Sequence, residues 1–392
     1  QADVNTIIAL LAPPDDRTEA GLSPDRIARF VMFKVPFEDV LDAATFKALE
    51  AATERQSTDR WRICVRPQRD LLEEGLARDE DEETDTAAKL KTVHIKTARY
   101  EANKWGGKYL RAPEIFFTIL EKGKGKLVRL GDIAEVNEGR PTGANDFFYV
   151  AKETAREFGI EPRFLFEGLM KTRGFNKFVI TPSCIDRYFL SVDMARADLK
   201  GTNVLRYIEH GERMGLHKRN TFSGKKEWYR FKVRRPAELL APCGVGSTFF
   251  CALNRAKAIA SNSYTEFRLN KPTDALPLWV VLNSVVFWLE LELVGRSSLG
   301  GGLLKVDPIE YRQIFVPQPE IVLERLGALQ KHITNLERRN VGPIESELLQ
   351  PDRRALDEVV FEVLGLTPGE REAVYEAVVA LVRARLEKAR SV

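Results

Sequence analysis

The stretch "LGDIAEVNEGRPTGANDFFYV", residues 130–150, decides how the middle of this chain is interpreted. It begins with alternating apolar and polar residues, continues through a polar segment with two glycines and a proline, and ends in an aromatic run. Alternation with a period of two is typical of a strand, and glycine and proline are typical of a turn. The stretch therefore predicts a strand, a polar loop and a second strand.

The predicted loop, residues 139–145, carries the kinds of side chain that contact nucleic acids. Its glycines permit backbone conformations that other residues resist, and its proline restricts the turn. Arg140 supplies a guanidinium, which pairs with guanine, and Asn145 supplies an amide, which pairs with adenine. Thr142 supplies a hydroxyl, which can hold a phosphate. We interpret the loop as a base-reading element, and an ordinary turn with polar side chains is the alternative.

Positive charge is concentrated in residues 213–235, which we name the basic segment. The whole chain has 60 lysines and arginines against 57 acids, a net charge of +3, whereas this segment has a single acid, Glu227. Trp228 and Tyr229 lie among its cations, and cations interleaved with aromatic residues suit a phosphate backbone with bases nearby. A solvated basic face and a surface for an acidic protein are the alternatives. The cations are Arg213, Lys218, Arg219, Lys225, Lys226, Arg230, Lys232, Arg234 and Arg235.

A third element, "GRSSLGGGLLKV" at residues 295–306, combines three consecutive glycines with hydrogen-bond donors. We name it the glycine-rich element. Glycine lets a backbone approach a ligand closely, and Arg296, Ser298 and Lys305 flank the glycines. No GK[ST] sequence follows and no GxGxxG is present, so a nucleotide site is not expected. We predict a sharp bend next to DNA, with a simple loop as the alternative.

The pattern along the chain predicts a mixed α/β (α+β) fold. Short strands and helices are mixed through residues 96–320, the predicted recognition domain. Leucines at three- and four-residue steps then begin a helical region at residues 321–392. The end of that region reads as two helices separated at "LGLTPGE", where a threonine precedes a proline at the expected helix start.

Residues 1–75 are predicted to form a separate first domain. An acidic run follows it and predicts a solvated linker at residues 76–95. The chain starts at Gln1, and an apolar run begins almost at once, so we expect it to be the C-terminal part of a longer protein. The strands expected in the first domain are residues 4–11, 29–35 and 61–67.

The residue types argue against several classes of site. The four cysteines and four histidines have no zinc-type spacing, so no metal site is expected, and free thiols fit a reducing cytoplasm. No apolar run of about 18 residues is present, so no membrane-spanning helix is expected. No HExxH, Ser/His/Asp set or paired-carboxylate signature offers catalytic residues.

Three separated motifs carry a family resemblance. "KWGGKYLRAPEIFF" (residues 104–117), "LVRLGDIAEVNEGRPTGANDFFYV" (127–150) and "SSLGGGLLKVDPIEYRQIFVPQP" (297–319) occur in this order. Together they resemble the target-recognition region of bacterial N6-adenine DNA methyltransferases of the Taq and Eco57I type, which belong to restriction-modification systems. The "LGDIAEV" element is also similar to the start of a half-domain in type I specificity subunits.

The resemblance implies a recognition module for double-stranded DNA. Residues 1–75 would be the last strands of a Rossmann-like methyltransferase domain, and residues 321–392 a helical tail. The parent enzyme would flip an adenine out of the duplex and methylate its amine with S-adenosylmethionine. The catalytic half or a restriction subunit is the further partner that this implies.

The chain departs from the family pattern at the catalytic motifs. The family's [ND]PP[YFW] tetrapeptide is absent, and "APPDD" at residues 12–16 lacks both the leading Asn or Asp and the trailing aromatic residue. The glycine-rich loop for S-adenosylmethionine is also absent. We therefore expect no catalytic, cofactor-binding or metal-binding residues in this chain, and no activity from it alone.

Two other functions fit the same sequence. The chain could be the recognition part of a fused restriction-and-modification polypeptide or of a phage-defence methyltransferase. It could also be a protein-interaction scaffold that docks partners on the helix at residues 321–338 and on the helical tail.

Overall fold

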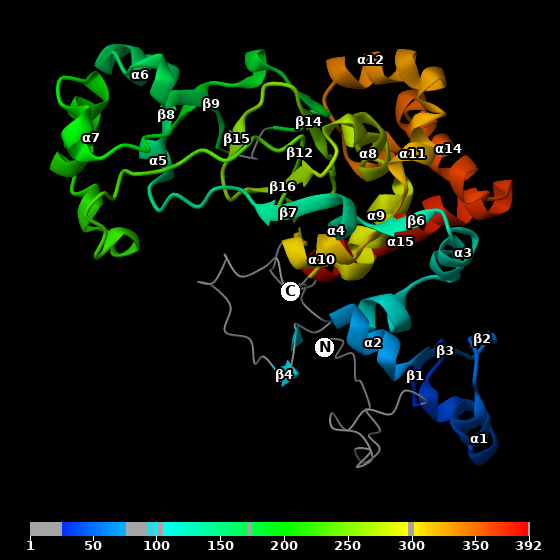
Figure 1. The fold of residues 1–392 in the computed structure, drawn as a ribbon. Helices are drawn as coiled ribbons and strands as arrows, with labels where there is room; N and C mark the ends of the chain where they lie inside the picture. The colour runs from blue at the N-terminus through cyan, green and yellow to red at the C-terminus, as the bar shows by residue number, and fades with distance from the viewer. Residues whose placement is uncertain are drawn as a thin grey trace. The chain divides into compact units, whose positions relative to one another are not determined.

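The computed structural model describes residues 26–75, 93–95, 98–100, 105–170, 175–296 and 302–390. The chain divides into two compact units, Gln1–Pro113 and Glu114–Val392 (Figure 1). The second unit contains nearly all of the predicted recognition domain and the whole predicted helical region. The predicted strand at residues 4–11 and nearly all of the predicted linker at residues 76–95 lie outside the described residues.

A three-stranded antiparallel sheet of order β1-β3-β2 forms the core of the first unit. It confirms the strands predicted at residues 29–35 and 61–67. The helix α1 begins after Asp42, whose carboxylate accepts a hydrogen bond from the Thr45 backbone at 2.7 Å. The elements are β1 (Ile27–Phe33), η1 (Phe37–Asp39), α1 (Ala43–Ala51), β2 (Gln56–Ser57), β3 (Trp61–Pro67), α2 (Gln68–Gly75), β4 (Val93–Ile95), β5 (Ala98–Tyr100) and η3 (Gly106–Arg111).

The second unit contains a four-stranded sheet of order β15-β9-β11-β8, which we call, with its helices, the four-stranded lobe (Figure 1). Its core is rich in aromatic side chains, including Phe147, Phe148, Tyr207 and Trp228. The lobe's elements are α5 (Asn145–Phe148), β8 (Tyr149–Ala151), α6 (Lys152–Phe158), η4 (Pro162–Phe164), β9 (Leu165–Leu169), β11 (Arg187–Leu190), η6 (Arg196–Leu199), α7 (Asn203–Arg213), η7 (Leu216–Lys218), η8 (Asn220–Phe222) and β15 (Ile259–Ala260).

A five-stranded sheet of order β10-β14-β12-β16-β7 is the other main sheet of this unit. Two small antiparallel pairs, β6 with β18 and β13 with β17, accompany it. The strands and the short helix between them are β6 (Leu127–Arg129), β7 (Ala134–Glu138), β10 (Val179–Ile180), η5 (Pro182–Cys184), β12 (Leu239–Pro242), β13 (Gly244–Val245), β14 (Ala252–Asn254), β16 (Tyr264–Leu269), β17 (Leu304–Lys305) and β18 (Phe315–Pro317).

Helices gather beside the five-stranded sheet (Figure 1). The apolar pair α8 and α9 is almost wholly buried, and Asn283 between them hydrogen-bonds the Cys251 backbone through both its amide oxygen and its amide nitrogen. The helices are α3 (Glu114–Lys122), α4 (Leu130–Ile133), η9 (Pro272–Asp274), α8 (Ala275–Leu282), α9 (Val285–Val294), α10 (Pro308–Gln313), α11 (Pro319–Leu323), η10 (Leu326–Leu329), α12 (Gln330–Arg338), α13 (Ile344–Glu347), α14 (Pro351–Leu364) and α15 (Pro368–Arg390).

Among the described helices, none is long and apolar enough by itself to span a bilayer, and one bent pair, Pro272–Leu282 with Val285–Val294, passes the same test of length and composition.

The helical tail has the predicted form. α14 ends at Leu364 and is followed by Gly365, which has a φ of 70°, and α15 begins beyond Thr367. The Thr367 backbone N–H donates to the Glu370 carboxylate at 2.6 Å, and the Glu370 N–H donates to the Thr367 hydroxyl at 3.4 Å. This reciprocal pair of hydrogen bonds is a capping box, which stabilises the start of a helix at "LTPGE".

The leucine pattern at residues 321–338 packs inward. Leu326, Leu329, Ile333 and Leu336 are buried, whereas Leu323 is exposed. Four of these five apolar side chains are therefore core residues, and they do not form the docking surface that the scaffold interpretation requires.

The stretch at residues 130–150 folds only partly as predicted. β7 is the expected first strand, but residues 145–148 form the short helix α5 before β8 begins. Consecutive side chains of a strand point to opposite faces, whereas Phe147 and Phe148 are both buried in one core, which a helical turn permits. The two strands also belong to different sheets, so the loop between them joins the four-stranded lobe to the five-stranded sheet.

Candidate nucleic-acid interface

The loop at residues 139–145 lies along the turn that precedes β16. The Gly139 N–H donates to the Tyr264 carbonyl at 2.7 Å, and the Arg140 N–H donates to the Ala260 carbonyl at 2.8 Å. A side chain at position 139 would collide with the Ser261 backbone, so only glycine fits there. The loop is thus held by backbone hydrogen bonds in a defined position.

Two of the three predicted polar side chains of this loop hold each other. The Thr142 hydroxyl donates to the Asn145 amide oxygen at 2.6 Å and accepts from the Ala144 N–H at 3.2 Å. Thr142 is only 3% exposed, so our expectation of a surface hydroxyl at this position is corrected. The Asn145 amide nitrogen is directed to the amide oxygen of exposed Asn262, at 3.4 Å.

The structure brings the basic segment to this loop. The Arg219 guanidinium donates to the Gly143 carbonyl at 3.0 Å, and Thr221 lies against Gly143. Gly143 has a φ of 72°, a backbone conformation that glycine adopts at low cost. Arg140 makes a second contact between the loop and the basic segment: its guanidinium donates to the Lys232 carbonyl at 3.2 Å.

The cations of the basic segment differ in their partners. Arg230 pairs with Asp193 and Glu227, each at 2.9 Å, and these two carboxylates raise the pKa of Arg230, with Glu227 the larger cause. Arg235 pairs with Glu238. Exposed cations with no carboxylate at ion-pair distance among the described residues are Arg213, Lys218, Arg219, Lys225, Lys226 and Lys232.

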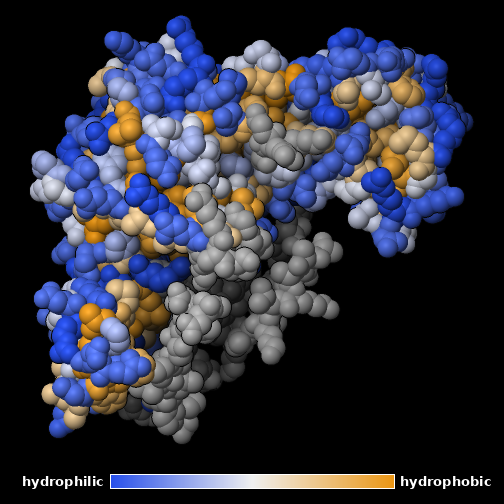
Figure 2. Space-filling model, turned by 180° about the vertical axis from the view of Figure 1, so that it is seen from behind, coloured by the Kyte–Doolittle hydropathy of each residue, from blue (hydrophilic) through white to orange (hydrophobic). Residues whose placement is uncertain are grey.

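Trp228 is not at the surface, which corrects its prediction as an exposed aromatic residue of the interface. It is 3% exposed, its ring centroid lies 4.9 Å from that of Phe147, and its indole N–H donates to Glu212 at 3.4 Å. Tyr229 is buried beside it. The aromatic residues of the basic segment anchor it to the core of the four-stranded lobe because burying a large ring is favourable. On the face drawn in Figure 2, that lobe (upper right) presents mainly hydrophilic side chains, with a smaller apolar area.

The glycine-rich element forms a separate, internally paired cluster. Arg296 and Lys305 both pair with Asp307, the latter at 3.0 Å, and their backbones are joined by two hydrogen bonds. Ser298 lies outside the described residues. Within the described chain, no hydrogen bond connects Arg296 or Lys305 to the loop at residues 139–145.

The C-terminal helix α15 holds the strands beside the glycine-rich element. Arg385 pairs with Glu292 at 2.7 Å and donates to the Gly246 carbonyl at 2.9 Å and to the Gly302 carbonyl. Both charged side chains are buried, so each needs the other to offset its desolvation. The helical tail therefore belongs to the framework of this element.

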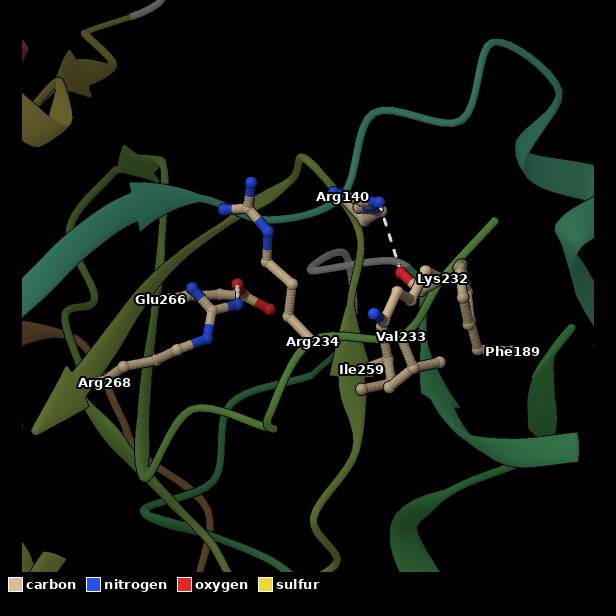
Figure 3. A pocket seen from close by; sticks show the side chains of 8 residues that line it. All are labelled: Arg140, Phe189, Lys232, Val233, Arg234, Ile259, Glu266 and Arg268. Atoms are coloured by element: carbon tan, nitrogen blue, oxygen red, sulfur yellow. Dashed lines mark hydrogen bonds and ion pairs between the residues drawn. The ribbon is translucent and has the colours of Figure 1, made fainter. Parts of the chain in front are cut away.

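A small pocket, open to solvent, lies where the loop, the basic segment and β16 meet. Figure 3 shows the side chains of these three segments around it. Burial raises the pKa of Glu266, although the neighbouring Arg268 opposes this. Burial, followed by the nearby cation Arg234, lowers the pKa of Arg140. The pocket is lined by Arg140, Phe189, Lys232, Val233, Arg234, Ile259, Glu266 and Arg268.

Glu266 and Arg268 are site residues that our sequence interpretation missed. They lie two positions apart in β16, a strand whose residues are all buried, and they form an ion pair with each other. An acid and a base at this spacing share one face of a strand, which is the signal that could have revealed them.

Among the described residues, no group of three or more His, Cys, Asp or Glu side chains is arranged to hold a metal ion.

Comparison with known proteins found one matching family and similar solved structures. The model of the type II methyltransferase M.Eco57I C-terminal domain matches residues 102–355. The structure resembles that of the type IIG restriction endonuclease BpuSI, with a TM-score of 0.50 and 13% identity over 93% of this chain and 40% of that chain. The type IIL restriction-modification enzyme MmeI, solved in complex with DNA, matches with a TM-score of 0.43 and 14% identity over 66% of this chain and 36% of that chain. A search of curated proteins gave no match.

Proposed function

The chain belongs to the family of the type II methyltransferase M.Eco57I C-terminal domain, and from this premise we propose that it recognises a specific sequence in duplex DNA. We propose further that it does so as part of an S-adenosylmethionine-dependent N6-adenine DNA methyltransferase of a restriction-modification system. The chain spans 40% of the length of BpuSI, so the catalytic reaction is assigned to the parent enzyme.

The observation that carries this proposal is the convergence of three separated segments. Gly143 accepts a hydrogen bond from Arg219 at 3.0 Å, and Asn145 reaches Asn262 at 3.4 Å. The partly exposed amide of Asn145 in the loop and the exposed amide of Asn262 thus lie beside a segment of exposed lysines and arginines. Amide groups can read base edges while cations contact phosphates, and sequence-specific DNA binding needs both kinds of contact.

Binding without catalysis is the expected behaviour of this chain. The [ND]PP[YFW] tetrapeptide that would hold the target adenine is not in the sequence. The decisive measurement is fluorescence anisotropy with labelled duplex DNA across a salt titration, together with a methyl-transfer assay using labelled S-adenosylmethionine. We expect affinity to fall steeply as salt rises, because cations at phosphates release counterions. An anisotropy signal that stays flat across the salt titration would refute DNA binding. Methyl transfer by this chain alone would refute the proposal that the catalytic residues lie outside it.

A second candidate is a parent enzyme that both cuts and methylates DNA. The fold likeness to BpuSI, a type IIG restriction endonuclease, over 93% of this chain favours it. The recognition role of this chain would be unchanged, and the nuclease would lie elsewhere in the polypeptide. Magnesium-dependent cleavage of duplex DNA by the complete parent polypeptide would support this candidate, and methylation without cleavage would exclude it.

A further inference from the structure

Arg140, which the sequence places in a base-reading loop, turns back toward the protein. Its guanidinium donates to the Lys232 carbonyl at 3.2 Å and lies 5.4 Å from the centre of the Phe231 ring. The residue is only partly exposed, and it lines the pocket in Figure 3. A side chain that probes a groove of DNA has to extend away from its loop, so this geometry does not suit base reading.

The pocket lining carries an excess of positive charge. Four cations line it, Arg140, Lys232, Arg234 and Arg268, against one carboxylate, Glu266. That carboxylate already pairs with Arg268, whose Nε donates in addition to the Arg235 carbonyl at 2.8 Å. Glu135 lies beside the pocket, 3.9 Å from Arg234 and 3.6 Å from Arg268, so four cations face two carboxylates. The remaining charge is positive, and an anion entering the pocket would offset the repulsion among these like charges.

The chemistry of the lining selects the kind of anion. Guanidinium and ammonium groups only donate hydrogen bonds, whereas a base edge presents donors as well as acceptors. The one acceptor side chain of the pocket, Glu266, is buried and occupied by Arg268. A group that only accepts, carries negative charge and is compact meets these demands, and in DNA that group is the phosphodiester.

We propose that Arg140 and Lys232, with Arg234 and Arg268 around the same pocket, form a seat for one backbone phosphate of the bound DNA. The seat rests on the proposed function. Arg140 then fixes the position of the DNA backbone. The exposed amide of Asn262, which Asn145 contacts, remains available to base edges. A phosphate contact is independent of sequence, so losing it weakens binding equally on every duplex.

The test uses the full chain and the variants Arg140→Gln and Lys232→Gln. Arg156→Gln is the matched control, because Arg156 lies on α6 of the same lobe, its side chain is 74% exposed and, among the described residues, it forms an ion pair with Glu153 alone. Binding is measured by anisotropy on a mixed-sequence duplex and on a duplex selected by the wild-type chain from a random library, at several salt concentrations. Thermal melting shows that each variant folds, and Lys232 is exposed, so its variant tests the seat without disturbing the core.

For Arg140→Gln we expect an affinity about tenfold lower on both duplexes and a salt slope smaller by about one, since one phosphate contact contributes ~0.9 to that slope. Lys232→Gln should act in the same direction, and Arg156→Gln should leave slope and affinity unchanged. Loss of discrimination at one base with an unchanged salt slope would show that Arg140 reads a base and would overturn the seat. Unchanged binding by both variants would overturn it as well. If the wild-type chain itself fails to bind DNA, the proposed function fails and the seat fails with it.

Discussion

The basic segment and the glycine-rich element look alike in sequence, since each combines cations with residues that favour close backbone approach. In the structure, the cations of the two regions differ in whether a carboxylate lies close enough to pair with them. Arg296 and Lys305 share Asp307, whereas Lys218, Lys225 and Lys226 are exposed without a carboxylate at ion-pair distance among the described residues. A cation that is paired with a carboxylate attracts a phosphate less strongly than an unpaired cation of the same exposure. The count of cations in a segment is therefore a poorer guide to DNA binding than the positions of the acids.

The two regions are also held in different ways. Trp228 anchors the basic segment through an aromatic core, and Arg385 of α15 anchors the glycine-rich element through a buried ion pair with Glu292. Because the aromatic residues anchor the segment, Lys218, Lys225 and Lys226 can remain exposed, whereas Arg219 and Arg230 also make contacts within the protein. Four experiments test whether the two regions differ in this way.

Replacing Trp228 with alanine removes the anchor of the basic segment. Because the side chain is 3% exposed and packs on Phe147, we expect a loss of about 3–5 kcal/mol in the free energy of unfolding. Chemical denaturation measures this loss. The variant Trp228→Phe should keep most of the stability and all of the DNA affinity. If folded Trp228→Phe lost much of its DNA affinity, Trp228 would contact DNA directly.

Reversing the exposed charges removes the proposed phosphate contacts. In the variant Lys218→Glu, Lys225→Glu and Lys226→Glu, we expect DNA affinity at moderate salt to fall about a hundredfold, ~3 kcal/mol. Anisotropy on a mixed-sequence duplex measures it.

The matched control for this charge reversal makes the same change in net charge elsewhere on the four-stranded lobe. It combines Arg156→Glu, Lys200→Glu and Arg206→Glu, three exposed cations outside the basic segment. If both triple variants lose affinity equally, net charge alone explains binding and the basic segment has no special role.

Asp357, a buried acid on α14, should affect the stability of the fold and not DNA binding. Burial raises the pKa of Asp357 to about 6, above its usual 3.8, although Arg353 opposes the shift. A raised pKa means that the fold prefers the protonated acid. The stability from this group is thus complete below about pH 3.8 and is lost as pH rises through about 6, by on the order of 2–3 kcal/mol.

Asp357→Asn isolates this effect, because an amide oxygen can still accept from the Val285 N–H, which donates to Asp357 at 2.6 Å. Denaturation at several pH values should show a flatter dependence between pH 4 and 7 than in the wild-type chain. A slope equal to that of the wild type would mean that another group titrates in this range.

Neutralising the glycine-rich element should change least. Arg296→Gln and Lys305→Gln remove two cations that both pair with Asp307, whose carboxylate offsets part of their charge, so we expect DNA affinity to stay within about twofold. The same anisotropy assay measures it. A tenfold loss of DNA affinity would show that these cations leave Asp307 and bind phosphate when DNA is present. The glycine-rich element would then bind DNA in the same way as the basic segment.

Part of the site was visible in the sequence because its signals are local. Residues 139–145 carry glycines where the structure needs them, at Gly139 against the Ser261 backbone and at Gly143 with positive φ. The neighbourhood of the loop was not visible. Arg219 is 76 residues from Gly143 and Asn262 is 117 from Asn145, and no spacing rule connects positions so far apart.

Sequence patterns alone predicted the mixed fold, the strands at β1 and β3, the two tail helices with a threonine cap between them, and the family resemblance. Each of these depends on periodicity, turn chemistry or motif order, which act over a few residues. The sequence patterns did not reveal which cations pair with acids, that Trp228 faces inward, or that Arg140, Lys232 and Glu266 line one pocket. Charge pairing and burial depend on distances in space, and the fold sets those by bringing remote segments together.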